Sequence, residues 1–132
     1  GGILAFSTWP RELFMGKFFK LIEDFSPPLP AEVASPVLWG DMTIIKKRLE
    51  NQFEKIEFGR DTMYAPTMSP AHMLKLFEKN AAPLSNLLKA LGDDPTKLTE
   101  LRNSALDLIK KYFSDNYLRQ DFLMTRCIKK SF

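Results

Sequence analysis

The sequence predicts an α/β chain, or an α+β chain when it is taken alone, with three strands and about five helices. Three stretches have the composition and patterning of strands: residues 3–8, 53–64 and 117–129. The segments between them carry apolar residues at helical spacing. We therefore expect one domain over residues 1–132, in which residues 66–116 form a helical insert between the second and third strands.

The first strand is expected at Ile3–Thr8, where an apolar run follows a glycine pair. A run this apolar is typical of a strand that is buried on both faces inside a parallel sheet. Such a strand needs neighbours on either side, and no strand precedes it in this sequence. The pattern therefore leads us to expect that the chain is the C-terminal half of a longer protein.

The next segments are predicted from proline positions and helical periodicity. Pro10 ends the first strand and can begin a helix that runs from about Arg11 to Phe25. The prolines that follow exclude a helix, so residues 26–40 are expected to be irregular. Asp41 has the composition of an N-cap for a short helix after that segment.

The second strand is expected at an edge of the sheet. Ile56 and Phe58 alternate with charged residues, which gives one apolar face and one wet face. Gly59 interrupts this alternation, and we interpret it as a bulge. The pairs Ser69-Pro70 and Asp94-Pro95 then combine a cap with a proline at the first helical position, so each predicts a helix start.

The last strand is expected inside the sheet. Along residues 117–129, Phe122, Met124 and Ile128 alternate with Leu123, Thr125 and Cys127. Both sets are largely apolar, so this strand is predicted to be covered on both faces.

Charge and cysteine content exclude several classes of function. The net charge is +3, but basic and acidic residues are interleaved, which does not favour nucleic-acid binding. The single cysteine, Cys127, allows no internal disulfide and is expected to be an inert core thiol in a cytoplasmic protein. No metal-ligand pattern is present, and the apolar N-terminal run is too short to span a membrane.

Four segments together resemble a known family. They are GGILAFSTW at the N-terminus, Leu38-Trp39-Gly40-Asp41, Ser69-Pro70-Ala71-His72, and residues 121–129. In this order they resemble the C-terminal half of class I S-adenosylmethionine-dependent methyltransferases, most closely the UbiE-like group. The resemblance implies a three-stranded mixed sheet edge in the order first-last-middle, with the last strand antiparallel to its neighbours.

The resemblance also implies what this chain lacks. The family binds S-adenosylmethionine with a glycine-rich turn after its first strand and an acidic residue after its second strand. Neither has a match in this sequence, where the only glycine pair, Gly1-Gly2, precedes a strand. We therefore carry over no cofactor-binding residue, and we expect the cofactor to bind the full-length parent and not this chain alone.

Candidate substrate-binding residues lie near the expected end of the first strand. Ligands of open α/β sheets bind at the carboxyl ends of the strands, which favours Trp9, Met15 and Gly16 as parts of a pocket for the methyl acceptor. Phe14 and Phe18 are better explained as the core stripe of a helix. Residues 26–40, which include Trp39, are either a lid over this pocket or a rigid surface connection.

His72 is the candidate general base and a further candidate substrate-binding residue. It is the only histidine and lies in the first turn of a predicted helix. The alternative is a surface or half-buried residue with a local hydrogen bond, which the absence of an evident carboxylate partner favours.

Two functions remain open from the sequence. The first is the acceptor side of a methyltransferase that acts on a small molecule and is inactive without its cofactor half. The second is a module without catalysis that binds a hydrophobic ligand or dimerises. A homodimer through the open edge of the first strand is compatible with either function.

Overall fold

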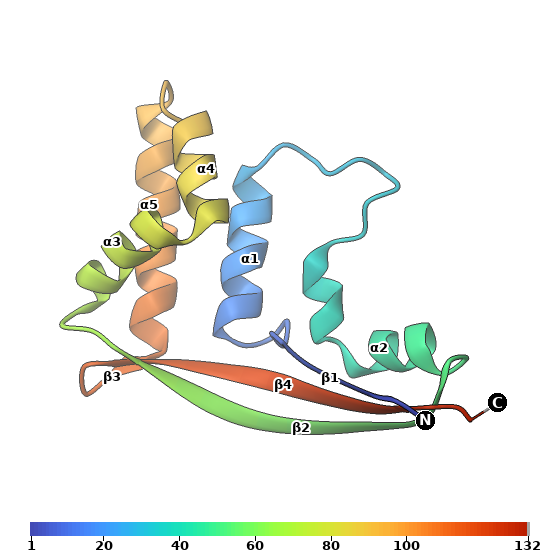
Figure 1. The fold of residues 1–132 in the computed structure, drawn as a ribbon. Coiled ribbons are helices and arrows are strands. Elements are labelled where there is room, and N and C mark those ends of the chain that lie inside the picture. The colour runs from blue at the N-terminus through green and yellow to red at the C-terminus, as the bar shows by residue number, and fades with distance from the viewer. Residues whose placement is uncertain (132) are drawn as a thin grey trace.

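A twisted sheet with every helix on one side of it organises the chain (Figure 1). The computed structural model describes residues 1–131. The strands are β1 (Ile3–Thr8), β2 (Phe53–Pro66), β3 (Phe113–Ser114) and β4 (Tyr117–Lys129). The α-helices are α1 (Phe14–Phe25), α2 (Met42–Leu49), α3 (Pro70–Asn80), α4 (Ala82–Ala90) and α5 (Pro95–Lys111), and η1 (Pro36–Gly40) is a 3₁₀ helix.

The last strand lies in the middle of the sheet, as predicted. The order is β1-β4-β2, and β4 runs antiparallel to both neighbours, so β1 and β2 run in the same direction. The predicted combination of helices with a sheet and the edge position of β2 are therefore confirmed. The sequence analysis missed β3, which forms a short hairpin with β4. Asp115 and Asn116 make its turn with φ angles of 49° and 61°, in the left-handed region that such hairpins require.

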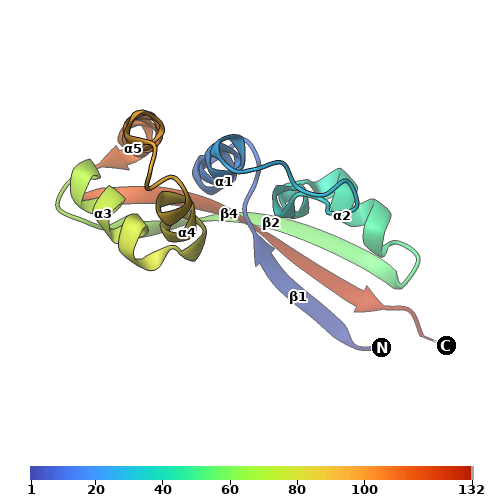
Figure 2. The same ribbon diagram turned by 90° about the horizontal axis from the view of Figure 1, so that it is seen from above.

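Two predictions about burial are wrong for the described chain. Ile3 is 63% exposed and Leu4 is 40% exposed, because β1 is an edge strand (Figure 2) and no helix covers its outer face. Met124 on the central strand β4 is 42% exposed because it lies on the face of the sheet that no helix covers (Figure 1). Only one set of the C-terminal β4 residues is fully buried, namely Leu123, Thr125 and Cys127.

The bulge predicted at Gly59 is also wrong. Gly59 pairs in register with Met124, and the irregularity in this strand pair lies between Phe53 and Lys55. A glycine in a strand removes side-chain packing but does not require a change of register, and here the ladder continues through it.

The predicted caps are confirmed, but the first helix begins later than expected. The side chains of Asp41, Ser69 and Asp94 accept hydrogen bonds from the first backbone N–H groups of α2, α3 and α5. In contrast, α1 begins at Phe14 because the Leu13 N–H donates to the Pro10 carbonyl at 3.2 Å and closes a separate turn.

An aromatic cluster forms the core between α1 and the helical insert. Phe14 and Phe18 are 0% and 1% exposed, which confirms their expected core role. Their ring centroids lie 5.8 Å apart, and Phe77 of α3 lies 4.9 Å from Phe18. Tyr112, after α5, lies 5.6 Å from Phe14. This cluster fixes α1, and with it the turn that leads from β1.

Candidate functional site

The turn after β1 is held between two glycines. A Cβ atom on Gly16 of α1 would lie 2.2 Å from the carbonyl oxygen of Pro10. A Cβ atom on Gly40 would lie 1.8 Å from the carbonyl oxygen of Trp9. Both distances are far below van der Waals contact, so each glycine allows the turn to approach another segment closely. The two contacts bring α1 and the end of η1 together at the carboxyl end of β1.

A groove runs between α1 and residues 26–40 on either side of this turn. We call it the α1 groove, and it consists of three adjoining hollows that share Val37 as a wall. The inner hollow, of about 220 Å³, is lined mainly by Thr8, Trp9, Gly16, Phe19, Pro36 and Trp39. The apolar hollow, of about 390 Å³, is lined mainly by Phe19, Ile22, Pro27, Pro28, Leu29 and Pro36. The polar hollow, of about 510 Å³, is lined mainly by Arg11, Glu12, Lys20, Glu23, Ser35 and Asp41.

Trp39 is a fixed wall of the inner hollow. Its ring meets the edge of Phe6 on β1 at a centroid distance of 5.9 Å. The Arg48 guanidinium of α2 lies 4.6 Å from the centre of the same ring. Because the two contacts come from different elements, they hold the indole in one orientation even though it is 38% exposed.

Residues 26–40 are fastened to α1 by side-chain hydrogen bonds. The Ser35 hydroxyl donates to the Glu23 carboxylate and accepts a hydrogen bond from the Val37 N–H, which starts η1. The Ser26 hydroxyl donates to the Ile22 carbonyl at 2.7 Å. These hydrogen bonds hold the segment in place as one wall of the groove. Its role as a lid stays a prediction.

The structure brings some of the predicted site residues together and separates others. Trp9, Gly16 and Trp39 meet in the inner hollow. Met15 is half-buried and packs against the aromatic core. His72 lies at the start of α3, beside the end of β2. The sequence analysis missed Thr8 and Phe19, which also line the inner hollow. Phe19 lies one helical turn after Met15, so helical periodicity could have identified it.

His72 has the local hydrogen bond that the sequence analysis gave as its alternative role. Its Nδ1 atom lies 3.0 Å from the Thr67 hydroxyl, which is nearly buried, and 3.5 Å from the Met68 nitrogen. A separate hollow of about 540 Å³ adjoins it and is also lined by Asp115 and Asn116. These contacts occupy one ring nitrogen, and they place His72 in a different hollow from Trp9 and Trp39.

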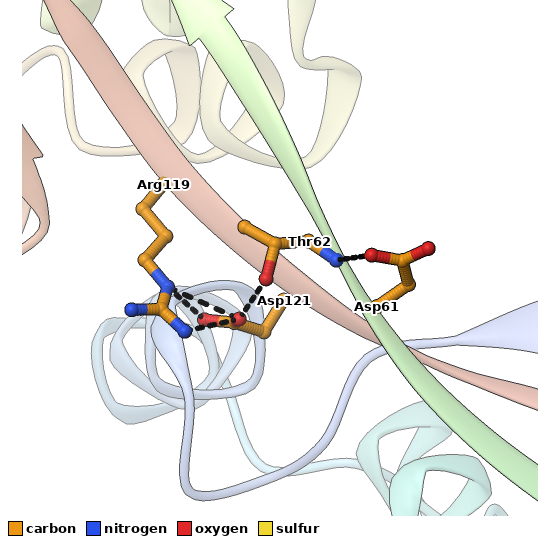
Figure 3. Close-up of polar contacts among 4 residues, drawn as sticks. All are labelled: Asp61, Thr62, Arg119 and Asp121. Atoms are coloured by element: carbon orange, nitrogen blue, oxygen red, sulfur yellow. Dashed lines mark hydrogen bonds and ion pairs between the residues drawn. The ribbon is translucent and has the colours of Figure 1, made fainter.

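A second polar cluster joins β2 to β4 (Figure 3). Arg119 and Asp121 come from β4, and Arg119 donates to both carboxylate oxygens at 2.9 to 3.1 Å. The Thr62 hydroxyl of β2 donates to the same carboxylate. Asp61 points away from Arg119 and accepts only from the Thr62 backbone N–H among the bonds drawn. The Asp121 carboxylate thus accepts hydrogen bonds from its own strand and from β2, so the cluster links the two strands.

Asp121→Asn is expected to destabilise the protein by a few degrees in Tm at neutral pH and by less in acid. Burial alone raises the pKa of Asp121, but hydrogen bonds from Arg119 and Thr62 and the charges of Arg119 and Arg60 outweigh it and lower the pKa. A lowered folded-state pKa stabilises the protein above the unfolded-state pKa, and this stability is lost as the pH falls through the folded-state pKa. The measurement is Tm from pH 7 to about pH 2. Asp61→Asn is the control, and an Asp121→Asn effect that persists undiminished in acid would contradict the prediction.

The described residues contain neither a group of metal-ligand side chains nor a membrane-spanning helix. Within residues 1–131, no three His, Cys, Asp or Glu side chains are grouped so that they could hold a metal ion. No helix of those residues combines the length and the hydropathy needed to cross a bilayer. Cys127 is fully buried, and this burial raises the pKa of its thiol, which favours the unreactive protonated form.

Comparisons with known proteins give relatives but no family. No family model matches the chain. It is 21% identical to the uncharacterized protein Rv1405c of Mycobacterium tuberculosis over 131 residues, which are 98% of this chain and 48% of that relative. It is 22% identical to the uncharacterized protein Rv1403c of the same organism over 125 residues, which are 94% of this chain and 46% of that relative. The chain thus spans about half the length of the curated relatives it matches, and the alignments extend over nearly all of it.

Proposed function

We propose that this chain is the acceptor-side half of an S-adenosylmethionine-dependent methyltransferase that acts on a small molecule. The observation that carries the proposal is the α1 groove at the carboxyl end of β1, where open α/β sheets bind their ligands. The sheet order β1-β4-β2, with an antiparallel central strand, agrees with the resemblance that suggested the family. The match to half of longer relatives is compatible with a separate cofactor half.

In this proposal the groove binds and orients the acceptor. Trp9, Trp39 and Phe19 would hold an apolar ring or chain, and the polar hollow beside Arg11 and Glu23 would face its polar end. Orientation of two reactants accounts for a large part of the rate of a bimolecular transfer. S-adenosylmethionine would supply the methyl group from the other half, and no residue of this chain is assigned to bind it. A cytoplasmic location is part of the same proposal.

The first measurement is the coding sequence upstream of Gly1. The proposal expects about a hundred further residues that contain a strand, a glycine-rich turn and an acidic residue after the next strand. The extended protein should then form S-adenosylhomocysteine with a panel of aromatic acceptors, whereas the 132-residue chain should not. A start codon within a few residues of Gly1 would contradict the methyltransferase and leave a ligand-binding module.

A variant in the α1 groove distinguishes a loss of acceptor binding from a general loss of stability. In the extended protein, Trp39→Ala should slow transfer by about tenfold because it removes one wall of the inner hollow. Val33→Ala is the matched control, since Val33 belongs to the same segment and is 51% exposed. Equal rates for the two variants would show that the acceptor does not bind in the α1 groove.

We further propose that two copies of this chain pair through β1. Residues 1–8 contain neither a charged side chain nor a proline, so nothing along this edge blocks the addition of a strand. Light scattering over a concentration series should show a mass that rises to twice that of one chain, and Ala5→Lys should keep it at one. A wild-type chain that stays monomeric at the highest concentration would exclude the pairing.

A further inference from the structure

Another hollow lies outside the α1 groove, where the end of β2 meets the start of β4 and the end of α5 (Figure 1). We call it the tyrosine hollow, and its volume is about 490 Å³. It shares no lining residue with the three hollows of the α1 groove. Its lining consists mainly of Tyr64, Lys111, Tyr112, Tyr117, Arg119 and Asp121. The proposed function makes no use of this hollow.

The chain has only three tyrosines, and all of them line this hollow. They come from separate elements, because Tyr64 lies on β2, Tyr117 lies on β4 and Tyr112 directly follows α5. The Tyr64 and Tyr117 rings meet edge to face with their centroids 6.2 Å apart, yet they are 59% and 46% exposed. Tyr112 is held by a hydrogen bond from the Lys17 ammonium at 3.1 Å. The hollow thus offers accessible aromatic surface on side chains that lose little conformational entropy when a ligand binds.

The strand register explains why these side chains gather on one face of the sheet. Tyr64 pairs directly with Arg119, and Tyr117 and Asp121 lie two residues to either side of Arg119 along β4. Side chains two residues apart in a strand point to the same face. Leu118, which lies between Tyr117 and Arg119, is buried in the hydrophobic core on the opposite face. This end of the two strands therefore presents two tyrosines, a guanidinium and a carboxylate together.

Positive charge exceeds negative charge in the lining of the tyrosine hollow. Its carboxylate, Asp121, already accepts hydrogen bonds from Arg119 and Thr62 (Figure 3). These bonds use the Nε and Nη2 atoms of Arg119 and leave Nη1 without a partner among the described residues. The Lys111 ammonium makes no hydrogen bond or ion pair within residues 1–131. Two cationic donors are therefore available to an anion, and the carboxylate in the lining is already paired.

We propose that the tyrosine hollow binds a small aromatic anion, with its ring against Tyr64 and Tyr117 and its charged group toward Lys111 and Arg119. Ammonium and guanidinium groups only donate hydrogen bonds, so the charged group must be an acceptor such as a carboxylate. Aromatic rings pack well against tyrosines in offset or edge-to-face geometry. The volume lies within the range that is usual for small-molecule sites. The inference is independent of the proposed function, because it requires neither a cofactor nor the α1 groove.

Benzoate and benzamide are the probes, because they have nearly the same shape and differ in charge. Ring-labelled tyrosine in the 132-residue chain gives NMR signals from only three residues, all of which line the hollow, so a titration reports binding there directly. We expect benzoate to shift these signals and to bind about fivefold more tightly than benzamide, as for a partly exposed ion pair. The difference should shrink as salt is added.

Lys111→Gln should remove the preference for benzoate and leave the Kd of benzamide unchanged. Lys110→Gln is the matched control, because Lys110 is the preceding residue of α5, is also exposed, and is not part of the lining of the hollow. Both variants lose the same net charge, so a difference between them reports the position of the ammonium group. Tyr64→Leu should weaken both probes by about threefold, because it removes one aromatic wall.

The outcomes of these titrations decide the proposal without reference to methyl transfer. Tyrosine signals that neither probe shifts, equal binding of benzoate and benzamide, or equal effects of the two lysine variants would each overturn it. The methyltransferase would then still be judged by the activity of the extended protein. If benzoate binding depends on Lys111 but the extended protein transfers no methyl group, the tyrosine hollow remains a binding site and the methyltransferase fails.

Discussion

Gly40→Ala is expected to destabilise the protein by about 3 kcal/mol, at the upper end of the range for overpacking. The added Cβ would lie 1.8 Å from the carbonyl oxygen of Trp9 and 3.0 Å from the Cα of Pro10. Both neighbours are backbone atoms, so no rotamer change can relieve the clash. The turn after β1 must then move away from η1, which also separates the two tryptophans that line the inner hollow. Urea denaturation measures the loss as a lower midpoint.

Gly59→Ala is the control for this substitution. A Cβ on Gly59 would have no atom within 4 Å, so the variant should be as stable as the wild type or slightly more stable. A Gly40→Ala protein with an unchanged midpoint would mean that the turn is not confined between Gly16 and Gly40. The α1 groove would then have no rigid inner end.

Phe14→Ala is expected to cost about 3–5 kcal/mol, a large part of the stability of a domain of this size. Phe14 is 0% exposed and lies at the centre of the aromatic cluster. Its ring neighbours come from three directions: Phe18 on its own helix, Phe77 on α3 and Tyr112 after α5. The rigid surroundings cannot close over the space, so the variant loses both burial and ring contacts. Thermal unfolding should show a much lower Tm.

Leu29→Ala is the comparison for that loss. Leu29 is also apolar but is 48% exposed on the segment that covers the groove, so its truncation should change Tm little. If the two variants unfolded at similar temperatures, the helical insert would not be packed through Phe14. The position of α1 beside β1 would then need another explanation.

The parts of the fold that were predicted correctly depend on local chemistry. The caps at Asp41, Ser69 and Asp94 satisfy backbone groups within three residues, so their effect is visible in a short stretch of sequence. The interior position of β4 was predictable from its long apolar run. The prediction that β1 and β4 are buried on both faces was wrong, because an apolar run is compatible both with a covered face and with an open one.

The candidate site was predicted only in part because it depends on approach between distant segments. Trp9 and Gly16 were proposed from their positions after the first strand, and Trp39 was proposed as part of residues 26–40. The pairing of Gly40 with the Trp9 carbonyl cannot be seen in either segment alone. The same holds for the Thr8 hydroxyl, which is buried without a hydrogen-bond partner among the described residues, a property that no short stretch of sequence shows. His72 was correctly given a local alternative, since its partner Thr67 is five residues away.

The central position of the last strand has a consequence for synthesis on the ribosome. β1 and β2 do not pair with each other, and each has β4 as its partner, at separations of more than a hundred residues in the case of β1. While the chain is being made, the apolar strand Ile3–Thr8 therefore emerges well before β4, and this pairing cannot form until residues 117–129 appear. Contacts this distant in sequence form slowly, and unpaired strands are the segments that chaperones and aggregates capture. The helices of the insert, whose contacts are local, can form during that interval and bring the two ends of the sheet together.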